Sequence, residues 1–141
     1  MPAKGTAEWR GELKTGAGTF TAGDTLAGEY SFRSRFDDGP GANPEQLIGA
    51  AHAACFSMYL SLLLEQAGTP AESVKTDALV TIGQVDGAPT ITNIALTAVG
   101  RVPGATEAAF LEAAEAAKRD CPVSKALAGV PNVTLSASLV S

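Results

Sequence analysis

Two cysteines, Cys55 and Cys121, are the residues of this 141-residue chain best suited to chemistry. A deprotonated thiol is a strong nucleophile, and two thiols that meet can form a disulfide and be reduced again. The two lie far apart in the chain and form no Cys-x-x-Cys motif, so spacing does not say whether they meet. On the residues alone, two buried thiols without chemistry are an equal alternative.

Cys55 falls in the middle of a predicted helix, where it needs a nearby cation to ionise. Arg33 and Arg35 are candidate cations, although arginines are mostly solvated surface residues. Glu45 suits the first turn of that helix, where a carboxylate complements the helix dipole. His52 lies three residues before Cys55 and faces the same side, which permits a Cys–His nucleophile. The ordinary alternative is a hydrogen-bonded histidine inside a packed helix.

The element that must position Cys55 is a long helix over residues 43–67. Asn43 is a good N-cap, Pro44 suits the first helical position, Gln46 can complete a capping box, and Gly68 ends the helix. Its side chains are apolar on nearly all sides, yet interrupted by enough polar residues to argue against a membrane span. We therefore expect a helix buried nearly all round, in part by a second subunit.

Short strands are predicted before this helix and a β-β-α-β segment after it. Residues 29–36 alternate as a strand, with Arg33 and Arg35 on one face and the aromatic residues on the other. Later come a hairpin over 74–84 and 91–102, a helix over 106–119, a short helical turn after Cys121 and a strand over 133–139. The predicted class is α+β, with antiparallel sheets packed around the long central helix, in one domain spanning residues 1–141.

Composition narrows the possible partners. The formal net charge is −5, which argues against nucleic acid because no basic patch is available to neutralise phosphates. The N-terminal residues lack the apolar run of a signal peptide, so we expect a cytoplasmic protein without a membrane partner. Two cysteines and one histidine fall short of the usual zinc ligand set.

Two motifs resemble those of the OsmC/Ohr family, which includes osmotically inducible proteins and organic hydroperoxide resistance proteins. The segment NPEQLIGAAHAACFSM at residues 43–58 is similar to the signature helix of the family, and CPVSKAL at residues 121–127 resembles its second cysteine motif. The regions Trp9–Gly11 and Phe32–Phe36 resemble the OsmC branch. The resemblance covers essentially the whole chain.

The resemblance implies a role for each of four residues. Cys55 matches the peroxidatic cysteine and Cys121 the resolving cysteine, while Glu45 matches the glutamate that pairs with a catalytic arginine. Arg35 matches that arginine in the OsmC branch, with Arg33 as the fallback. The Ohr branch has its arginine in an earlier glycine-rich turn, and residues 15–18 contain none. His52 matches no catalytic role.

The activity implied is reduction of organic hydroperoxides to alcohols. Cys55 becomes a sulfenic acid, Cys121 condenses with it to a disulfide, and a dithiol reductant such as a lipoylated protein restores both thiols. The family requires no metal, flavin or haem. Apolar neighbours of Cys55, namely Leu47, Phe56 and Met58, favour alkyl or fatty-acid hydroperoxides. Two rivals remain: a non-catalytic module that binds an apolar ligand, and a Cys–His acyl-transfer enzyme using His52.

The resemblance and the apolar helix together predict an intertwined homodimer with active sites at the interface. Glu45 and Cys55 are ten residues apart, or roughly 15 Å along one helix. Two helices crossing about a two-fold axis could bring Glu45 of one subunit near Cys55 of the other. A long Arg35 side chain within one chain is the alternative.

Overall fold

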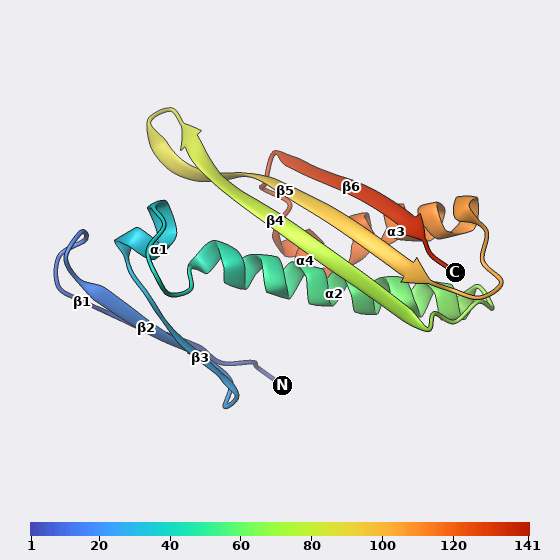
Figure 1. Ribbon diagram of the computed structural model, residues 1–141, viewed down its shortest axis with the longest axis horizontal. Helices are drawn as coiled ribbons and strands as arrows, with labels where there is room; N and C mark the ends of the chain where they lie inside the picture. Colours follow the sequence, from blue (N-terminus) through green and yellow to red (C-terminus); the bar gives the residue numbers. More distant parts are fainter. The chain divides into compact units, whose positions relative to one another are not determined.

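The computed structural model describes residues 1–141, which divide into two compact units, Met1–Leu47 and Ile48–Ser141. The boundary falls inside the long helix α2 (Pro44–Gln66). Each unit contains one three-stranded sheet, and the predicted α+β class is confirmed (Figure 1). That residues 1–141 form a single domain stays a prediction.

The first unit is built on an antiparallel sheet of β1 (Gly5–Arg10), β2 (Ala17–Ala22) and β3 (Leu26–Tyr30), in that order. β1 and β2 confirm the short strands predicted before the long helix. Gly18 pairs with both Trp9 and Tyr30, whose rings pack with centroids 5.5 Å apart. The absence of a side chain on Gly18 makes room for this pair, since a Cβ there would lie 2.4 Å from the Tyr30 ring.

The strand predicted over residues 29–36 is wrong after Tyr30. β3 ends at Tyr30, and Phe32–Phe36 form the short helix α1. Ser31 is its N-cap: the Ser31 side chain accepts from the Ser34 backbone N–H, and the Ser34 hydroxyl accepts from the Ser31 N–H. This capping box satisfies donors that a helix start leaves free, so it favours the helix over the strand.

Helix α2 begins and ends as the sequence predicts. Asn43 Oδ1 accepts from the Gln46 backbone N–H at 2.8 Å, and Gln46 Oε1 accepts from the Asn43 N–H at 3.2 Å. At the other end Gly68 adopts φ +86°, a left-handed conformation that glycine allows at little cost. The helix is therefore set at both ends by local sequence.

Burial of α2 within one chain is one-sided, so burial nearly all round, which was expected to need a second subunit, stays a prediction. Phe56, Leu60 and Leu64 on one face are 0–2% exposed, whereas Met58 is 78% exposed and Leu62 43% exposed. The sequence argument against a membrane span also needs correction, because α2 is long and apolar enough to cross one by length and composition. Its buried face carries the core of the second unit, as in a soluble core helix.

The second unit contains β4 (Ser73–Val85), β5 (Ala88–Arg101) and β6 (Asn132–Leu139), in that order in the sheet. The predicted hairpin is confirmed, with Asp86 and Gly87 in its turn at positive φ. β6, however, pairs parallel to β5, so the prediction of purely antiparallel sheets is wrong. The connection between them carries helices α3 (Glu107–Asp120) and α4 (Pro122–Ala126), and such a long crossover is what a parallel pair needs.

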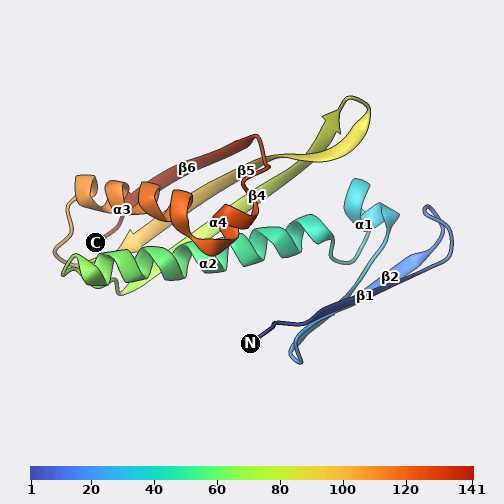
Figure 2. The same ribbon diagram turned by 180° about the vertical axis from the view of Figure 1, so that it is seen from behind.

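One face of this sheet is covered by helices. Figures 1 and 2 show α2, α3 and α4 on the same side of β4–β5–β6. Alternate residues of β5, namely Ile94, Leu96 and Ala98, are 0–1% exposed and form one core with the buried face of α2 and with Phe110 of α3. Cys121 belongs to this core, which fixes the position of α4 relative to α2.

Candidate active site

Arg35 and Glu45, both in the first unit, form the ion pair that the resemblance implies. Arg35 Nη2 donates to Glu45 Oε1 at 2.7 Å, and Arg35 Nε donates to Oε1 at 3.0 Å and to Oε2 at 3.3 Å. Two nitrogens on one carboxylate make a charge-assisted, bidentate pair, which fixes the plane of the guanidinium. Glu45 is 6% exposed, and the Arg35 side chain is 36% exposed, so part of the Arg35 side chain remains accessible.

Capping interactions place these two side chains. Arg35 lies on α1, which the Ser31–Ser34 capping box starts, and Glu45 lies in the first turn of α2. Asn43 connects the two helices, because its Nδ2 donates to the Ser34 carbonyl at 2.9 Å while its Oδ1 caps α2. Arg33 is exposed and forms no ion pair, so the structure pairs Arg35, and not the fallback, with Glu45.

An apolar pocket of about 170 Å³ lies beside the Arg35 guanidinium. Its walls are mostly aromatic and aliphatic, from Trp9, Leu13, Tyr30, Phe32 and Phe36. The Arg35 guanidinium carbon lies 5.4 Å from the centre of the Phe36 ring. The pocket thus combines one fixed cation with an apolar wall, an arrangement suited to a small ligand with a polar head and an alkyl or aryl tail.

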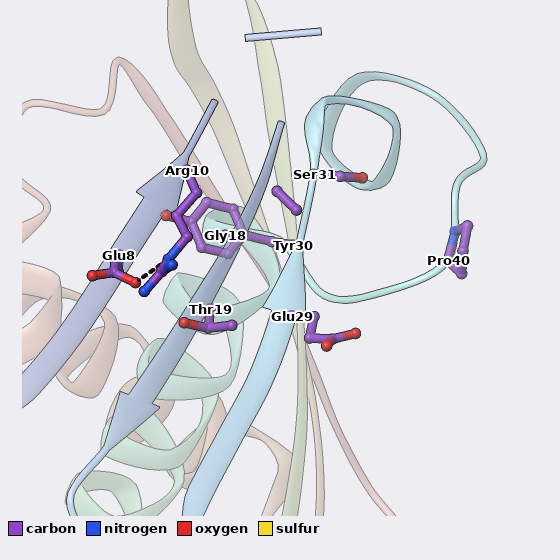
Figure 3. Close-up of a pocket in the computed structure, with 9 residues that line it drawn as sticks. Glu8, Arg10, Gly18, Thr19, Glu29, Tyr30, Ser31 and Pro40 are labelled. Carbon is purple, nitrogen blue, oxygen red and sulfur yellow. Dashed lines mark hydrogen bonds and ion pairs between the residues drawn. The ribbon is translucent and has the colours of Figure 1, made fainter. Parts of the chain in front are cut away.

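A larger hollow of about 410 Å³ lies on the same unit, beside the paired strands (Figure 3). It is lined by Glu8, Arg10, Thr19, Glu29 and Tyr30, among others. Glu8 and Arg10 pair with each other across 2.7 Å, and their side chains are 61% and 82% exposed. The hollow contains no cysteine and no histidine, so it offers neither of the thiols that the proposed chemistry needs.

The two cysteines lie together in the second unit, as free thiols. Cys55 is half-buried on α2, and Cys121 is fully buried at the start of α4. Burial raises the pKa of the Cys55 thiol, and the neighbouring Cys121 side chain raises it further, whereas a hydrogen bond from the Val123 backbone N–H lowers it. Cys55 thus has a neighbouring thiol but lacks a cation within this unit to favour its thiolate.

Cys121 is held by Ser124. The Cys121 sulfur is the N-cap acceptor of α4, receiving the Ser124 backbone N–H at 3.4 Å, and its thiol donates to Ser124 Oγ at 3.0 Å. Ser124 Oγ also lies 2.8 Å from His52 Nε2. A continuous line of polar contacts therefore runs from His52 through Ser124 to Cys121.

His52 is a buried, hydrogen-bonded histidine, as the ordinary interpretation held. It is 0% exposed, and burial lowers its pKa, so the ring is neutral at pH 7. Its ring bonds to Ser124 and not to Cys55, which gives no support to the Cys–His acyl-transfer hypothesis. Nδ1 is buried without a hydrogen-bond partner.

Of the apolar residues expected near the substrate, Phe56 is wrongly assigned. It is 0% exposed within the core, so it cannot line a site for a ligand. Met58 is largely exposed and remains available. The aromatic residues beside Arg35 offer a better-formed wall, and two of them, Phe32 and Phe36, lie on α1, which the strand prediction missed.

The sequence arguments also missed Ser124. The signal was present, because a side chain at an N-cap position accepts from the backbone N–H three residues later, which from Cys121 is Ser124. Its hydroxyl then lies near the same sulfur. The contact with His52 could not be predicted, since it joins residues that are distant in the chain.

Comparison with known proteins identifies related chains. Residues 36–136 match the family model described as OsmC-like protein. The chain is 45% identical over 126 residues to Peroxiredoxin OsmC of Escherichia coli strain K12, covering 88% of each chain. It is 36% identical over 100 residues to the Organic hydroperoxide resistance protein of Xanthomonas axonopodis pv. citri, covering 70% of this chain and 68% of that one.

The fold is shared with solved structures as well. The organic hydroperoxide resistance protein OhrB of Bacillus subtilis aligns with a TM-score of 0.71 at 27% identity, covering 99% of this chain and 98% of that one. This likeness extends over both units, including the first, of which the family model covers only the end.

Proposed function

Because this chain belongs to the OsmC-like protein family, we propose that it is a thiol-dependent peroxidase that reduces organic hydroperoxides to alcohols. The observation that carries the proposal is the pair of adjacent free thiols, Cys55 and Cys121, in a chain 45% identical to a peroxiredoxin. One half-buried thiol backed by a fully buried second thiol suits a peroxidatic and a resolving cysteine.

In the first step the Cys55 thiolate attacks the terminal oxygen of the hydroperoxide. The S–O bond forms as the O–O bond breaks, and the alkoxide leaves as the alcohol after taking up a proton. Because burial raises the pKa of Cys55, the step requires a cation near the sulfur. We assign that role to Arg35, with Glu45 fixing its guanidinium through the bidentate pair.

In the second step the Cys121 sulfur attacks the oxidised sulfur of Cys55. The S–S bond forms, the S–O bond breaks and the oxygen leaves as water. An external dithiol, either a small molecule or a lipoylated protein, then reduces the disulfide by exchange and restores both thiols. The contact between the two thiols supports this pairing.

The substrate class follows from the pocket beside Arg35. A hydroperoxide with an aryl or alkyl tail can pack that tail against Phe32 and Phe36 while its oxygens lie near the guanidinium. Hydrogen peroxide gains nothing from such a wall, because it has no apolar surface to bury. We therefore propose organic hydroperoxides as the preferred substrates.

We further propose that the working form is a homodimer in the cytoplasm. Of the residues in the most apolar stretch of α2, 28% are fully buried within one chain. Its uncovered face includes Ala50, Ala54, Met58 and Leu62, and a second copy of the chain would remove this apolar face from water. In such a dimer the Arg35–Glu45 pair of one subunit would serve Cys55 of the other.

The test is a peroxidase assay with cumene hydroperoxide and a dithiol, repeated on single variants. Cys55→Ser should abolish turnover, because it removes the group that meets the peroxide. Cys121→Ser should block turnover but still allow one oxidation, which leaves a sulfenic acid detectable as an added oxygen by mass spectrometry. Complete loss of the first oxidation in both variants would contradict the assigned roles.

A further inference from the structure

The polar line from His52 to Cys121 is not needed to hold the fold at either end. Cys121 already receives the Ser124 backbone N–H, which suffices for its role as N-cap. The Ser124 hydroxyl nonetheless lies 3.0 Å from the Cys121 sulfur and 2.8 Å from His52 Nε2. One hydroxyl thus joins a reacting sulfur to the chain's single histidine.

The second step of the proposed reaction has a proton to remove. An ordinary thiol is largely protonated at neutral pH, and the thiolate is the attacking form. Cys121 is fully buried, so bulk water has no direct access to its proton. A hydroxyl at hydrogen-bond distance with a neutral imidazole behind it is a route for that proton.

We propose that Ser124 and His52 form a proton relay for the resolving cysteine, an inference that rests on the peroxidase function proposed above. As Cys121 attacks the Cys55 sulfenic acid, Ser124 Oγ takes the Cys121 proton and passes its own proton to His52 Nε2. The S–S bond forms, the S–O bond breaks, and the departing hydroxide takes up the proton held by His52, leaving as water. Ser124 touches the reacting sulfur, and His52 acts through Ser124.

The surroundings of His52 suit this role. Burial lowers the pKa of His52 without a contribution from any neighbouring charge, so the ring is neutral at neutral pH. The relay uses the tautomer with its hydrogen on Nδ1, which leaves the Nε2 lone pair facing Ser124 Oγ. Through Ser124 the ring is connected to the Cys121 thiol. Lys125 on α4 is exposed, and Lys75 and Asp77 lie on the exposed face of β4, away from the core. These three charged side chains therefore face solvent and not the relay.

The experiment follows one turnover without reductant. Reduced protein receives one equivalent of cumene hydroperoxide, and timed samples are analysed by mass spectrometry for the sulfenic acid and the disulfide, from pH 6 to pH 10 by roughly one-unit steps. The variants are Ser124→Ala and His52→Gln, with Ser124→Thr to restore the hydroxyl. Ser57→Ala is the matched control, because it removes a hydroxyl of α2 that bonds to Thr76 instead.

The relay predicts that disulfide formation slows about tenfold or more at pH 7 in Ser124→Ala and His52→Gln, and recovers in Ser124→Thr. The deficit should shrink as pH rises, because hydroxide then removes the Cys121 proton directly. If the Ser124→Ala variant formed the disulfide at the wild-type rate, the relay would be refuted. An equal deficit at every pH would also overturn it, since misplacement of Cys121 does not depend on pH. If circular dichroism shows that His52→Gln is unfolded, the Ser124 variants decide.

A second arm separates the relay from the peroxidase. Cys55 is first loaded with a small aromatic disulfide, 5,5′-dithiobis(2-nitrobenzoic acid), and attack by Cys121 is followed by release of the coloured thiolate. This step needs the Cys121 proton removed but involves no peroxide. A wild-type protein inert to hydroperoxides but showing the Ser124-dependent release would refute the peroxidase and support the relay. Equal release from wild type and Ser124→Ala would refute the relay alone.

Discussion

At the scale of single residues, the chemistry divides between two groups of side chains. The Arg35–Glu45 pair lies in the first unit, and the two cysteines with His52 and Ser124 lie in the second. The surroundings of Cys55 thus disfavour its thiolate, since burial raises the pKa of this thiol. The proposed reaction consequently depends on a cation supplied from the other group.

Arg35→Ala should slow the oxidation of Cys55 about tenfold or more at pH 7, because a nearby opposite charge lowers a thiol pKa by about one to three units. The deficit should narrow above the thiol pKa, where Cys55 ionises without help. Rapid-mixing kinetics with cumene hydroperoxide from neutral to alkaline pH measure both effects. Arg33→Ala is the control, and a larger loss in that variant would move the assignment to Arg33.

Burial of His52 also makes stability depend on pH. The folded protein binds a proton at His52 less readily than the unfolded chain, whose histidine titrates near 6.5. Its contribution is complete above that pH and is lost as the pH falls, by up to about 1.4 kcal/mol per pH unit. Urea unfolding of reduced protein between neutral and mildly acidic pH measures this effect. The free energy of unfolding should depend less on pH in His52→Gln than in the wild type. Parallel profiles would contradict this account.

At the scale of secondary structure, local signals predicted most elements and tertiary context decided the rest. The cap at Asn43 and the stop at Gly68 could be predicted from the sequence because each acts within a few residues. The helix formed by the sequence FRSRF from Phe32 could not be predicted in this way. Its aromatic residues fit both a strand with period two and a helix with neighbours at i and i+4. The rings of Phe32 and Phe36 in fact pack 5.1 Å apart on α1.

The direction of β6 shows a different limit. Alternation in residues 133–139 predicts the strand and its two faces. It does not predict whether the strand runs parallel or antiparallel to its neighbour, because the pattern is identical in both directions. The long helical connection from β5 is the signal that favours a parallel pair, because parallel strands need a crossover of this length. Likewise, no local pattern joins His52 to Ser124, so that part of the site required the folded structure.

Close packing of α3 on β5 depends on Gly100. A Cβ at this position would lie 2.5 Å from Phe110 Cε1, and Phe110 is fully buried. Gly100→Ala should therefore reduce the free energy of unfolding by about 1–3 kcal/mol, as overpacked cores do. Gly129→Ala is the control, because a Cβ there meets nothing within 4 Å. Urea denaturation of both variants measures the difference, and equal stability would show that the ring can move aside.

At the scale of the whole molecule, the apolar face of α2 is the feature that one chain leaves uncovered. If a second copy covers it, replacing Leu62 with glutamate should shift the protein towards monomers in sedimentation equilibrium. A charge placed in an apolar interface is costly because it loses its hydration. Leu111→Glu on the exposed side of α3 is the matched control, since that leucine is 47% exposed and lies outside the proposed interface.

Sites shared between subunits make a further prediction. Mixing inactive Cys55→Ser with inactive Glu45→Ala under conditions of subunit exchange should restore about a quarter of wild-type activity, since half of the random dimers carry one intact site. Mixing Cys55→Ser with Cys121→Ser should restore none, because both thiols of a site belong to one chain. No recovery in the first mixture despite proven exchange would mean that each chain serves its own cysteine.

The contact between Cys55 on α2 and Cys121 in the crossover from β5 to β6 has a thermodynamic consequence for the catalytic cycle. A bond between them closes a long loop of chain, which restricts the unfolded state and adds about 4 kcal/mol of stability. The oxidised form, which must still be reduced, would then be the more stable of the two. The reduced form, which reacts with peroxide, would unfold more easily. Heat and proteases would therefore remove the reduced protein first. When dithiol is scarce, the protein would accumulate in the oxidised form, which would have the longer lifetime.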